Sequence, residues 1–287
     1  MTPLRFAIAG CGGIAGLHAE CLRRLASEGL AQLVGGFDRT ERRRAEFGAK
    51  WSVPMVASME ELLARDEVDA VIITTPSGTH GELAAQVANS GRHVLVEKPL
   101  DLRLNKADAA IAAAKRAGVT LGGVSQQRFI PAVAAVKRAI DAGYFGQIVL
   151  VHSETPWYRP QSYYDSAGWR GTWAFDGGVL ANQGTHMIDR LLWLAGDVDQ
   201  VLSATLECGR GRNVEVETLA VATIRLFNGA LGTITGTTLA YDGLPQRIII
   251  CGTEGSCAFS GDGLVAFKTL RPMTGDAPVL SSSEGQS

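Results

Sequence analysis

Residues 176–189 read DGGVLANQGTHMID and include amide, imidazole and carboxylate side chains, which are types that do chemistry. If residues 179–195 form a helix, its apolar residues recur on one face at helical spacing: Leu180, Met187, Leu191 and Leu194. The opposite face then holds an amide, an imidazole and a carboxylate, from Asn182, His186 and Asp189. Histidine is suited to moving a proton because its ordinary pKa lies near neutrality. A lone histidine on a helix is more often structural than catalytic. The other motifs of the chain are therefore needed to decide whether His186 is catalytic.

A second chemical signature stands near the N-terminus, where residues 10–15 read GCGGIA between a β-branched run and a helical pattern. This is a G-x-G-x-x-A motif in the context that dinucleotide binding requires. The first glycine allows a tight turn, the second lets the backbone approach a pyrophosphate, and the small third residue keeps helix and strand close. The predicted cofactor-binding residues of this loop are Gly10, Gly12, Gly13, Ile14 and Ala15.

Asp38 ends the next predicted strand, where a carboxylate can accept hydrogen bonds from both hydroxyls of an adenosine ribose. This position favours NAD as the cofactor. Arg39 follows directly and could hold the 2′-phosphate of NADP, so NADP stays possible. The alternative is a glycine-rich turn in some other doubly wound protein, with Asp38 as a helix cap.

Polar residues also follow two later predicted strands. The run VDAVIITTPSGTH ends with Thr75, Pro76 and His80, and the run HVLVEKP ends with Glu97 and Lys98. Because ligands of open α/β sheets bind outside the carboxyl ends of the strands, we expect these residues near the cofactor. The proline after the lysine keeps that lysine out of helical dihedrals and fixes its direction.

The order of strands and helices that must position these groups changes once along the chain. Up to about residue 123, short β-branched runs alternate with helical patterns, which implies a parallel sheet covered on both faces. Beyond it, successive strands are joined by tight turns such as Asn228-Gly229, which favours an antiparallel sheet. The predicted fold class is therefore α/β. An N-terminal Rossmann doubly wound parallel sheet (1–123) precedes a C-terminal α+β domain on a mostly antiparallel open sheet (124–287).

Composition limits the partners. A net charge of −2 with 20% charged residues gives no sign of nucleic acid or an acidic membrane, so we expect a small-molecule substrate. The five cysteines show no C-x-x-C pair and no metal spacing, so no metal site is predicted. The N-terminus lacks the pattern of a signal peptide, and we expect a cytoplasmic protein. His18, His93 and His152 are expected to be structural.

The chain resembles the Gfo/Idh/MocA oxidoreductases from Arg5 to about Phe267. The resemblance rests on GCGGIA, ITTPSGTH, GRHVLVEKP, QQRF at 126–129 and GGVLANQGTHMID. It implies an NAD(P)-dependent dehydrogenase that moves a hydride between the nicotinamide and a secondary hydroxyl of a sugar, sugar nucleotide or cyclitol. Lys98 and His186 would be the catalytic residues at the reactive carbon. The histidine would take the proton and the lysine would stabilise charge on oxygen. Gln127 would lie at the cofactor.

One residue departs from a common pattern of this family. Many members have aspartate four residues before the histidine, whereas this chain has Asn182, and an amide is no general base. The base would then be His186, alone or with Lys98. The stretches WRGTWAFDGG and NQGTH are most like the branch that oxidises UDP-N-acetylglucosaminuronate at C3. The resemblance thus implies a set of substrate-binding residues: Asn182, Gln183, Asp189, Arg170, Trp169 and Tyr164.

Two other functions stay open at this point. The same fold supports NAD-dependent glycosidases, which act by transient oxidation at C3, and it also supports non-catalytic dinucleotide-binding modules. Relatives usually continue past the polar tail that begins at Ser281, so the C-terminal domain is expected to be short. An open sheet with an apolar outer face predicts a homodimer or homotetramer.

Overall fold

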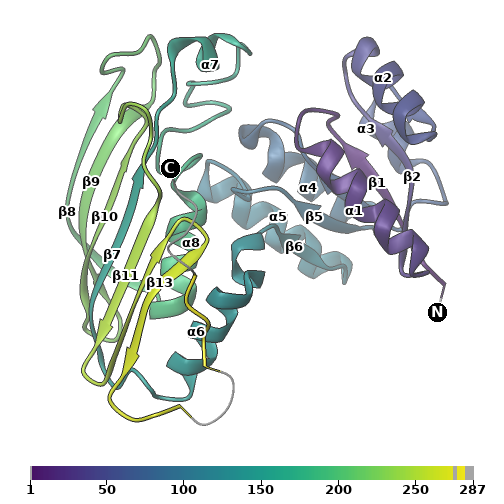
Figure 1. The fold of residues 1–287 in the computed structure, drawn as a ribbon. Coiled ribbons are helices and arrows are strands. Elements are labelled where there is room, and N and C mark those ends of the chain that lie inside the picture. Colours follow the sequence, from purple (N-terminus) through teal and green to yellow (C-terminus); the bar gives the residue numbers. More distant parts are fainter. Residues whose placement is uncertain (1, 274–276, 282–287) are drawn as a thin grey trace. The chain divides into compact units, whose positions relative to one another are not determined.

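The computed structural model describes residues 2–273 and 277–281 (Figure 1). The predicted polar tail beyond Ser281 therefore lies outside the described residues. The chain divides into two compact units. The first is Met1–Val124 together with Ala174–Asp176, and the second is Ser125–Trp173 together with Gly177–Ser287.

The first unit is built on a parallel sheet of six strands in the order β3-β2-β1-β4-β5-β6. Its strands are β1 Leu4–Ala9, β2 Ala31–Phe37, β3 Met55–Val56, β4 Ala70–Ile73, β5 His93–Val96 and β6 Leu121–Gly123. Its helices are α1 Ala15–Ser27, α2 Glu41–Trp51, α3 Met59–Leu63, α4 His80–Asn89 and α5 Leu104–Ala117, with a 3-10 turn η1 at Ser77–Thr79. The predicted doubly wound parallel sheet is confirmed.

Strand β1 shows why this sheet is covered on both faces. Ile8 packs in one buried cluster with residues of α1 and α2, whereas Ala7 and Ala9 pack in another with residues of α4 and α5. A strand buried on both sides reads as a continuous apolar run, as LRFAIA nearly does. Because strand order reverses between β1 and β4, the loop after β1 opens at the switch point where such sheets bind ligands.

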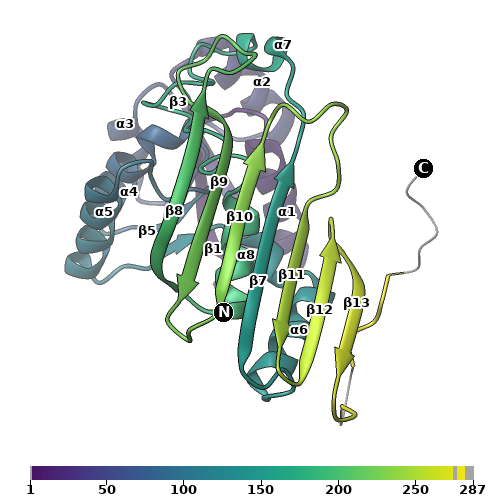
Figure 2. The ribbon, with the colours of Figure 1, turned by 90° about the vertical axis from the view of Figure 1, so that its left-hand side faces the viewer.

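The second unit is built on a sheet of seven strands in the order β13-β12-β11-β7-β10-β9-β8 (Figure 2). Its strands are β7 Ile148–Pro156, β8 Val198–Cys208, β9 Glu217–Leu226, β10 Leu231–Thr237, β11 Arg247–Gly252, β12 Gly255–Ser260 and β13 Gly263–Thr269. Its helices are α6 Pro131–Asp141, α7 Gln161–Asp165 and α8 Thr185–Ala195, after a 3-10 turn η2 at Gln126–Phe129. Only β7 and β10 pair in parallel, so the prediction of a mostly antiparallel sheet is confirmed.

Helix α8 packs its apolar face onto this sheet. Met187, Leu191 and Leu194 are buried in one cluster with Val151 of β7 and Ile250 of β11. The 3.6-residue spacing seen in the sequence therefore predicted the correct face. Burial of three such side chains stabilises the packing by about 1.5–3 kcal/mol each.

The predicted start of this helix was wrong. A helix was expected from Val179, but α8 begins at Thr185, after the N-cap Gly184. The backbone N–H of Val179 donates to the Glu217 carbonyl, and the N–H of Leu180 donates to the Glu217 carboxylate. These hydrogen bonds to β9 hold the segment in turns, and a glycine within a helix is unfavourable in any case. Asn182 thus precedes the helix on which His186 and Asp189 lie.

Helices able to span a membrane and residue clusters able to bind a metal ion are both absent from the described part of the chain. Within residues 2–273 and 277–281, no helix reaches the length and apolarity needed to cross a membrane. In the same part of the chain, no group of three or more histidine, cysteine, aspartate or glutamate residues is arranged so that it could bind a metal ion.

Candidate active site

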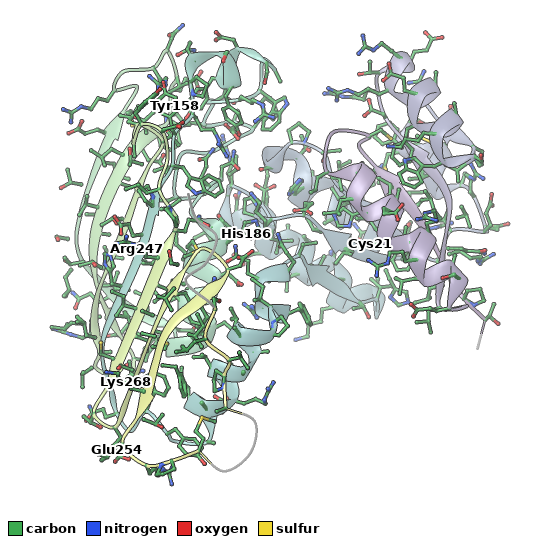
Figure 3. The ribbon with its side chains drawn as sticks, viewed as in Figure 1. Cys21, Tyr158, His186, Arg247, Glu254 and Lys268 are labelled. Carbon is green, nitrogen blue, oxygen red and sulfur yellow. The ribbon has the colours of Figure 1, made fainter. Side chains whose placement is uncertain are left out.

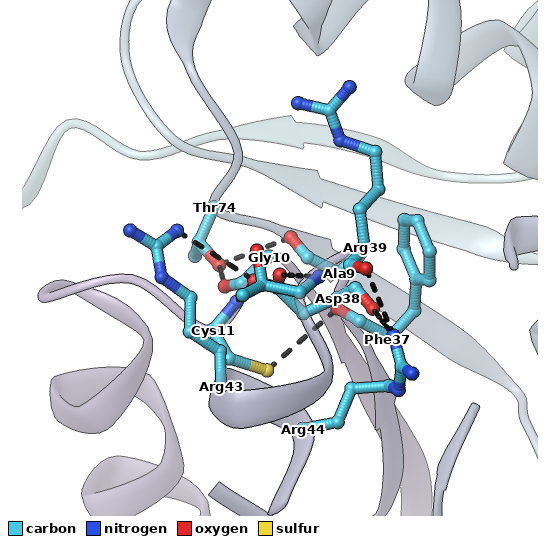
Figure 4. A network of polar contacts seen from close by, with 10 residues as sticks. Ala9, Gly10, Cys11, Phe37, Asp38, Arg39, Arg43, Arg44 and Thr74 are labelled. Carbon is cyan, nitrogen blue, oxygen red and sulfur yellow. Dashed lines mark hydrogen bonds and ion pairs between the residues drawn. The ribbon is translucent and has the colours of Figure 1, made fainter. Parts of the chain in front are cut away.

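The glycine loop after β1 is held tightly against the end of β4. Gly10 has a φ of +97°, and a Cβ at this position would lie 2.8 Å from the backbone nitrogen of Thr75. The Gly10 N–H donates to the Phe37 carbonyl at 2.7 Å, and the Thr74 hydroxyl donates to the Gly10 carbonyl (Figure 4). Only glycine fits here, because both the dihedral angle and the space exclude a side chain.

The other side of the same loop is open. A Cβ added to Gly12 or Gly13 would meet no atom within 4 Å. This space lies at the N-terminus of α1, whose first turn contains no acidic residue. Free backbone N–H groups and the helix dipole make such a place a binding site for phosphate. The loop therefore fits the pyrophosphate of a dinucleotide.

Asp38 follows β2 and lies beside this loop. Its carboxylate is almost buried and accepts hydrogen bonds at 2.8 Å from the backbone N–H groups of Cys11 and Thr40. Each carboxylate oxygen retains a lone pair for a ribose hydroxyl. The Arg43 guanidinium stands 4.0 Å from Asp38, and the side chain of Arg39 extends away from this network (Figure 4). The residues present thus fit an NAD molecule, with the Arg43 guanidinium as the positive charge nearest to the Asp38 carboxylate among the side chains drawn in Figure 4.

Substitutions of Gly10 and Gly12 are expected to have opposite effects on stability and on NAD binding. Gly12→Val should leave the thermal unfolding temperature nearly unchanged, because its side chain enters open space. The same variant should weaken NAD binding by about tenfold or more, since that space is the phosphate site. Gly10→Ala should instead lower the unfolding temperature, because strain and overlap cost about 1–3 kcal/mol. Calorimetry and NAD titration measure both effects, and equal NAD affinity in Gly12→Val would contradict the assignment.

His80 connects the ends of β4 and β5. Its buried ring has Nδ1 at 2.8 Å from the Pro99 carbonyl and Nε2 at 2.7 Å from the Thr75 carbonyl. Pro76 precedes the turn η1, and the Thr79 hydroxyl donates to that of Thr75. The imidazole thereby fixes the two segments on which the predicted cofactor residues Thr75, Pro76 and Lys98 lie. Contact of His80 itself with the cofactor stays a prediction.

Glu97 is engaged on both carboxylate oxygens. Its Oε1 lies 2.8 Å from Nε2 of His18 on α1, and its Oε2 accepts from the backbone N–H of Lys98 at 3.1 Å. Burial alone would raise the pKa of Glu97, but these hydrogen bonds and the charges of His18 and Lys98 outweigh it and lower the pKa. The sequence placed His18 among structural residues and did not reveal this pair.

Lys98 follows this carboxylate at the carboxyl end of β5, before a cis peptide bond to Pro99. Burial lowers the pKa of the Lys98 ammonium, while the negative charges of Glu97 and Asp176 act in the opposite direction. Asp176 belongs to the short segment that groups with the first unit. The ammonium therefore releases a proton more readily than an ordinary lysine, yet two carboxylates favour its charged form.

The depressed pKa of Glu97 predicts a pH-dependent stability difference. Since the folded pKa lies below the ordinary 4.5, the stabilisation is present above pH 4.5 and is lost as the pH falls through the folded value. Glu97→Gln should therefore be less stable than the native chain at neutral pH, by about 1–3 kcal/mol. Unfolding curves between neutral pH and pH 3 should show this difference shrinking. A pH-independent difference would rule the explanation out.

In the second unit, α8 contains Asp189 and also His186, which is labelled in Figure 3. Both carboxylate oxygens of Asp189 accept from the Arg128 guanidinium, at 2.9 Å and 2.5 Å. Arg128 also lies over the ring of Trp193, 5.8 Å from its centroid. The structure thus gives Asp189 an ionic partner from η2 that sequence reasoning missed. A substrate contact of Asp189 stays a prediction.

The remaining predicted substrate residues lie in different environments. Tyr164 is buried and its hydroxyl donates to that of Thr238 at 3.0 Å, so this group faces its own sheet. Gln183 is also buried. By contrast, Arg170 is partly exposed, and its guanidinium lies over the ring of Trp169, 4.9 Å from the ring centroid. Gln127 on η2 has a buried Oε1 without a hydrogen-bond partner among the described residues.

Comparison with known proteins decides the family. Residues 4–124 match the oxidoreductase family with an NAD-binding Rossmann fold, and residues 133–258 match the GFO/IDH/MocA C-terminal domain. The chain is 30% identical to the myo-inositol 2-dehydrogenase of Thermotoga maritima over 88% of this chain and 74% of that enzyme. The chain belongs to the GFO/IDH/MocA oxidoreductase family. The resemblance inferred from the motifs is confirmed, as are the oxidoreductase class and the NAD cofactor.

Other known proteins match over similar lengths. The scyllo-inositol 2-dehydrogenase (NAD(+)) of Bacillus subtilis is 31% identical over 88% of this chain and 72% of that enzyme. Among solved structures, the WlbA dehydrogenase of Bordetella pertussis in complex with NADH and UDP-GlcNAcA superposes with a TM-score of 0.91. It is 35% identical, with 94% of this chain and 78% of that chain covered. The family's two-part fold therefore extends through nearly all of this chain.

Proposed function

We propose that the chain is an NAD(P)-dependent dehydrogenase for a secondary hydroxyl of a sugar, sugar nucleotide or cyclitol. One observation supports this most: Lys98, with a pKa lowered by burial, stands at the strand end of an NAD-binding fold, next to the Glu97–His18 pair. The names of the relatives, inositol dehydrogenases and a WlbA dehydrogenase, support the same reaction class. In this proposal residues 1–123 bind the cofactor and residues 124–287 bind the substrate.

Oxidation of a secondary alcohol removes a hydride from carbon and a proton from oxygen. When bound, the nicotinamide supplies the hydride acceptor. We assign the proton to the imidazole of His186, whose residue type exchanges protons near neutral pH. We assign to Lys98 the hydrogen bond that orients the hydroxyl and stabilises negative charge on its oxygen. Asn182 binds a hydroxyl or orients the imidazole, because an amide does not take up a proton.

The experiment that tests this function follows nicotinamide absorbance. The purified protein is mixed with NAD and, separately, with UDP-aminosugar uronates, free aldoses and inositols. Appearance of NADH with one class supports a dehydrogenase. Release of a free sugar without net NADH would instead indicate the glycosidase reaction, and cofactor binding without any turnover would indicate a binding module.

We propose in addition that copies of this chain associate through the outer face of the second sheet. Exposed apolar residues of three adjacent strands form a patch there: Leu150, Leu231 and Ile249. Threonines at paired positions of β9 and β10 make the patch less apolar than expected from the sequence. Light scattering should show a dimer or tetramer, and Leu231→Glu should shift it toward monomer. A monomeric native chain at micromolar concentration would contradict this.

A further inference from the structure

Glu217, the first residue of β9, is a buried acidic residue of the second unit. Its exposed fraction is 5%, and it contacts the turn before α8 through both its main chain and its side chain. The Glu217 carbonyl accepts from the Val179 N–H at 3.0 Å, and Oε1 accepts from the Leu180 N–H at 3.1 Å. Burial of a carboxylate is unfavourable unless it is hydrogen-bonded. One residue of the sheet therefore holds two consecutive peptide groups of the turn.

The carboxylate also lies directly against Gly178. A Cβ added to this glycine would lie 1.7 Å from Oε2 of Glu217. The φ of Gly177 is +71°, whereas that of Gly178 lies outside the left-handed region. The backbone dihedral of Gly178 therefore does not require glycine, but the approach of the carboxylate does. Because Glu217 is buried, its side chain has no open space into which it could move aside.

The turn held in this way leads directly into the first turn of α8. The Val179 carbonyl accepts from the N–H of the N-cap Gly184 at 2.6 Å. The Leu180 carbonyl accepts from the hydroxyl of Thr185, the first residue of α8, at 3.2 Å. His186 is the next residue along the helix. Hydrogen bonds thus connect the buried carboxylate with the start of the helix through only two residues.

Asn182 depends on the same turn. Its backbone N–H donates to the Gly178 carbonyl at 3.0 Å. Gly178 and Val179 are buried, whereas Asn182 and His186 are partly exposed. A buried, hydrogen-bonded turn therefore ends in the two side chains to which the proposed function gives a role. Displacement of a reacting group by about 1 Å can lower a rate roughly a hundredfold, so the support of these side chains affects the reaction.

We propose that Glu217 is a positioning residue of the dehydrogenase reaction. Its carboxylate fixes the turn at 178–182 and thereby the direction of Asn182 and His186. Glu217 acts through these two residues and not on the substrate itself. This inference rests on the proposed function, because only that function assigns the imidazole a proton to move. The sequence did not single out Glu217, whose partners lie far from it along the chain.

Kinetics of two Glu217 variants test the role. Glu217→Ala should lower kcat by about tenfold to a hundredfold, because it releases the turn. NAD affinity should not change, since the glycine loop belongs to the first unit. Glu217→Gln retains an oxygen of the same reach for the Leu180 N–H and should keep kcat within about threefold of the native value. An equal loss in both variants would contradict the role of the accepted hydrogen bond.

A second measurement needs no substrate. With histidine labelled by a heavy nitrogen isotope, NMR spectra report the ring nitrogens, and those of His186 are identified by their absence in His186→Asn. Glu217→Ala should shift the His186 ring resonances, and Glu217→Gln should leave them near their native positions. A merely structural role of Glu217 would lower the unfolding temperature without shifting them.

Asn228→Ala is the matched control, because Asn228 holds the other end of the same helix. Its Nδ2 donates to the Ala195 carbonyl at 2.7 Å, and its Oδ1 accepts from the Ala230 N–H at 3.1 Å. Loss of these hydrogen bonds should lower the unfolding temperature. The His186 ring resonances and kcat should match those of the native chain.

Gly178→Ala perturbs the same contact from the opposite side, since the added methyl group overlaps the carboxylate. It should shift the His186 resonances and lower kcat even if Glu217→Ala does not fold. In the Glu217→Ala background the further effect of Gly178→Ala should be small, because the overlap is relieved. Effects of the two substitutions that simply add would contradict the proposed contact.

One result would overturn the inference outright: native His186 resonances in folded Glu217→Ala and Gly178→Ala. Failure of the proposed function is distinguishable, because the spectra require no turnover. Shifted His186 resonances in a chain that oxidises no substrate would refute only the dehydrogenase. NADH formation at the native rate in Glu217→Ala would refute only the positioning role.

Discussion

Lys98→Met should lower kcat by about a hundredfold to a thousandfold, as expected when a donor to developing oxyanion charge is removed. Methionine retains the apolar stem but cannot donate to the substrate oxygen. Because the cradle for the dinucleotide is formed by the glycine loop and Asp38, NAD affinity should change little. Steady-state kinetics on the substrate found in the panel, with a separate NAD titration, measures both quantities.

Lys106→Met is the control for this experiment. Lys106 lies on α5 of the same unit and pairs with Glu82 at 2.9 Å, on the surface of the helices. It should retain native kinetics. If Lys98→Met turned over as fast as the Lys106→Met control, the role assigned to Lys98 would be wrong.

His186→Asn should lower kcat/KM by about a hundredfold to ten-thousandfold, the range for loss of a general base. Asparagine retains hydrogen-bonding groups but takes up no proton near neutrality. The native enzyme should lose activity toward acidic pH as the imidazole becomes charged. This decrease of activity toward acidic pH, the acidic limb of the pH profile, should be absent in the variant. The residual rate of the variant should rise with hydroxide concentration. Rates measured from pH 5 to 10 test both expectations.

His152→Asn separates loss of a base from loss of any histidine. His152 lies on β7 with its Nδ1 2.5 Å from the Thr233 hydroxyl, on the outer side of the second sheet. The pH profile of the His152→Asn variant should match that of the native chain. An unchanged acidic limb in His186→Asn would assign the proton to another group, with Lys98 as the next candidate.

The fold could be predicted from local sequence patterns because each pattern is compatible with one type of secondary structure. Alternation of apolar runs with helical periods implies crossovers, and β1 confirmed it by packing its two faces against different helices. The start of α8 could not be predicted in this way. Its preceding residues donate to Glu217, a contact across 37 residues of sequence that no local pattern encodes.

For the candidate site, the strand-end rule placed Glu97 and Lys98 after a parallel strand, and the structure has them directly after β5. Their contact with cofactor and substrate stays a prediction. The rule did not find His18, whose partner Glu97 lies 79 residues away, or Arg128, which pairs with Asp189 across 61 residues. Such pairs depend on how elements pack. The only sequence signal was the position of His18 on the helix that follows the glycine loop.

Hydride transfer from a sugar carbon to the nicotinamide is the central claim. It is tested most directly with a sugar nucleotide that has deuterium at the carbon to be oxidised. After incubation with the purified protein and NAD, the reduced cofactor is isolated and its mass is measured. We expect NADH that is one mass unit heavier, because the deuteride moves directly between the two carbons. Unlabelled NADH, or no reduced cofactor from any deuterated substrate class, would contradict the proposed function.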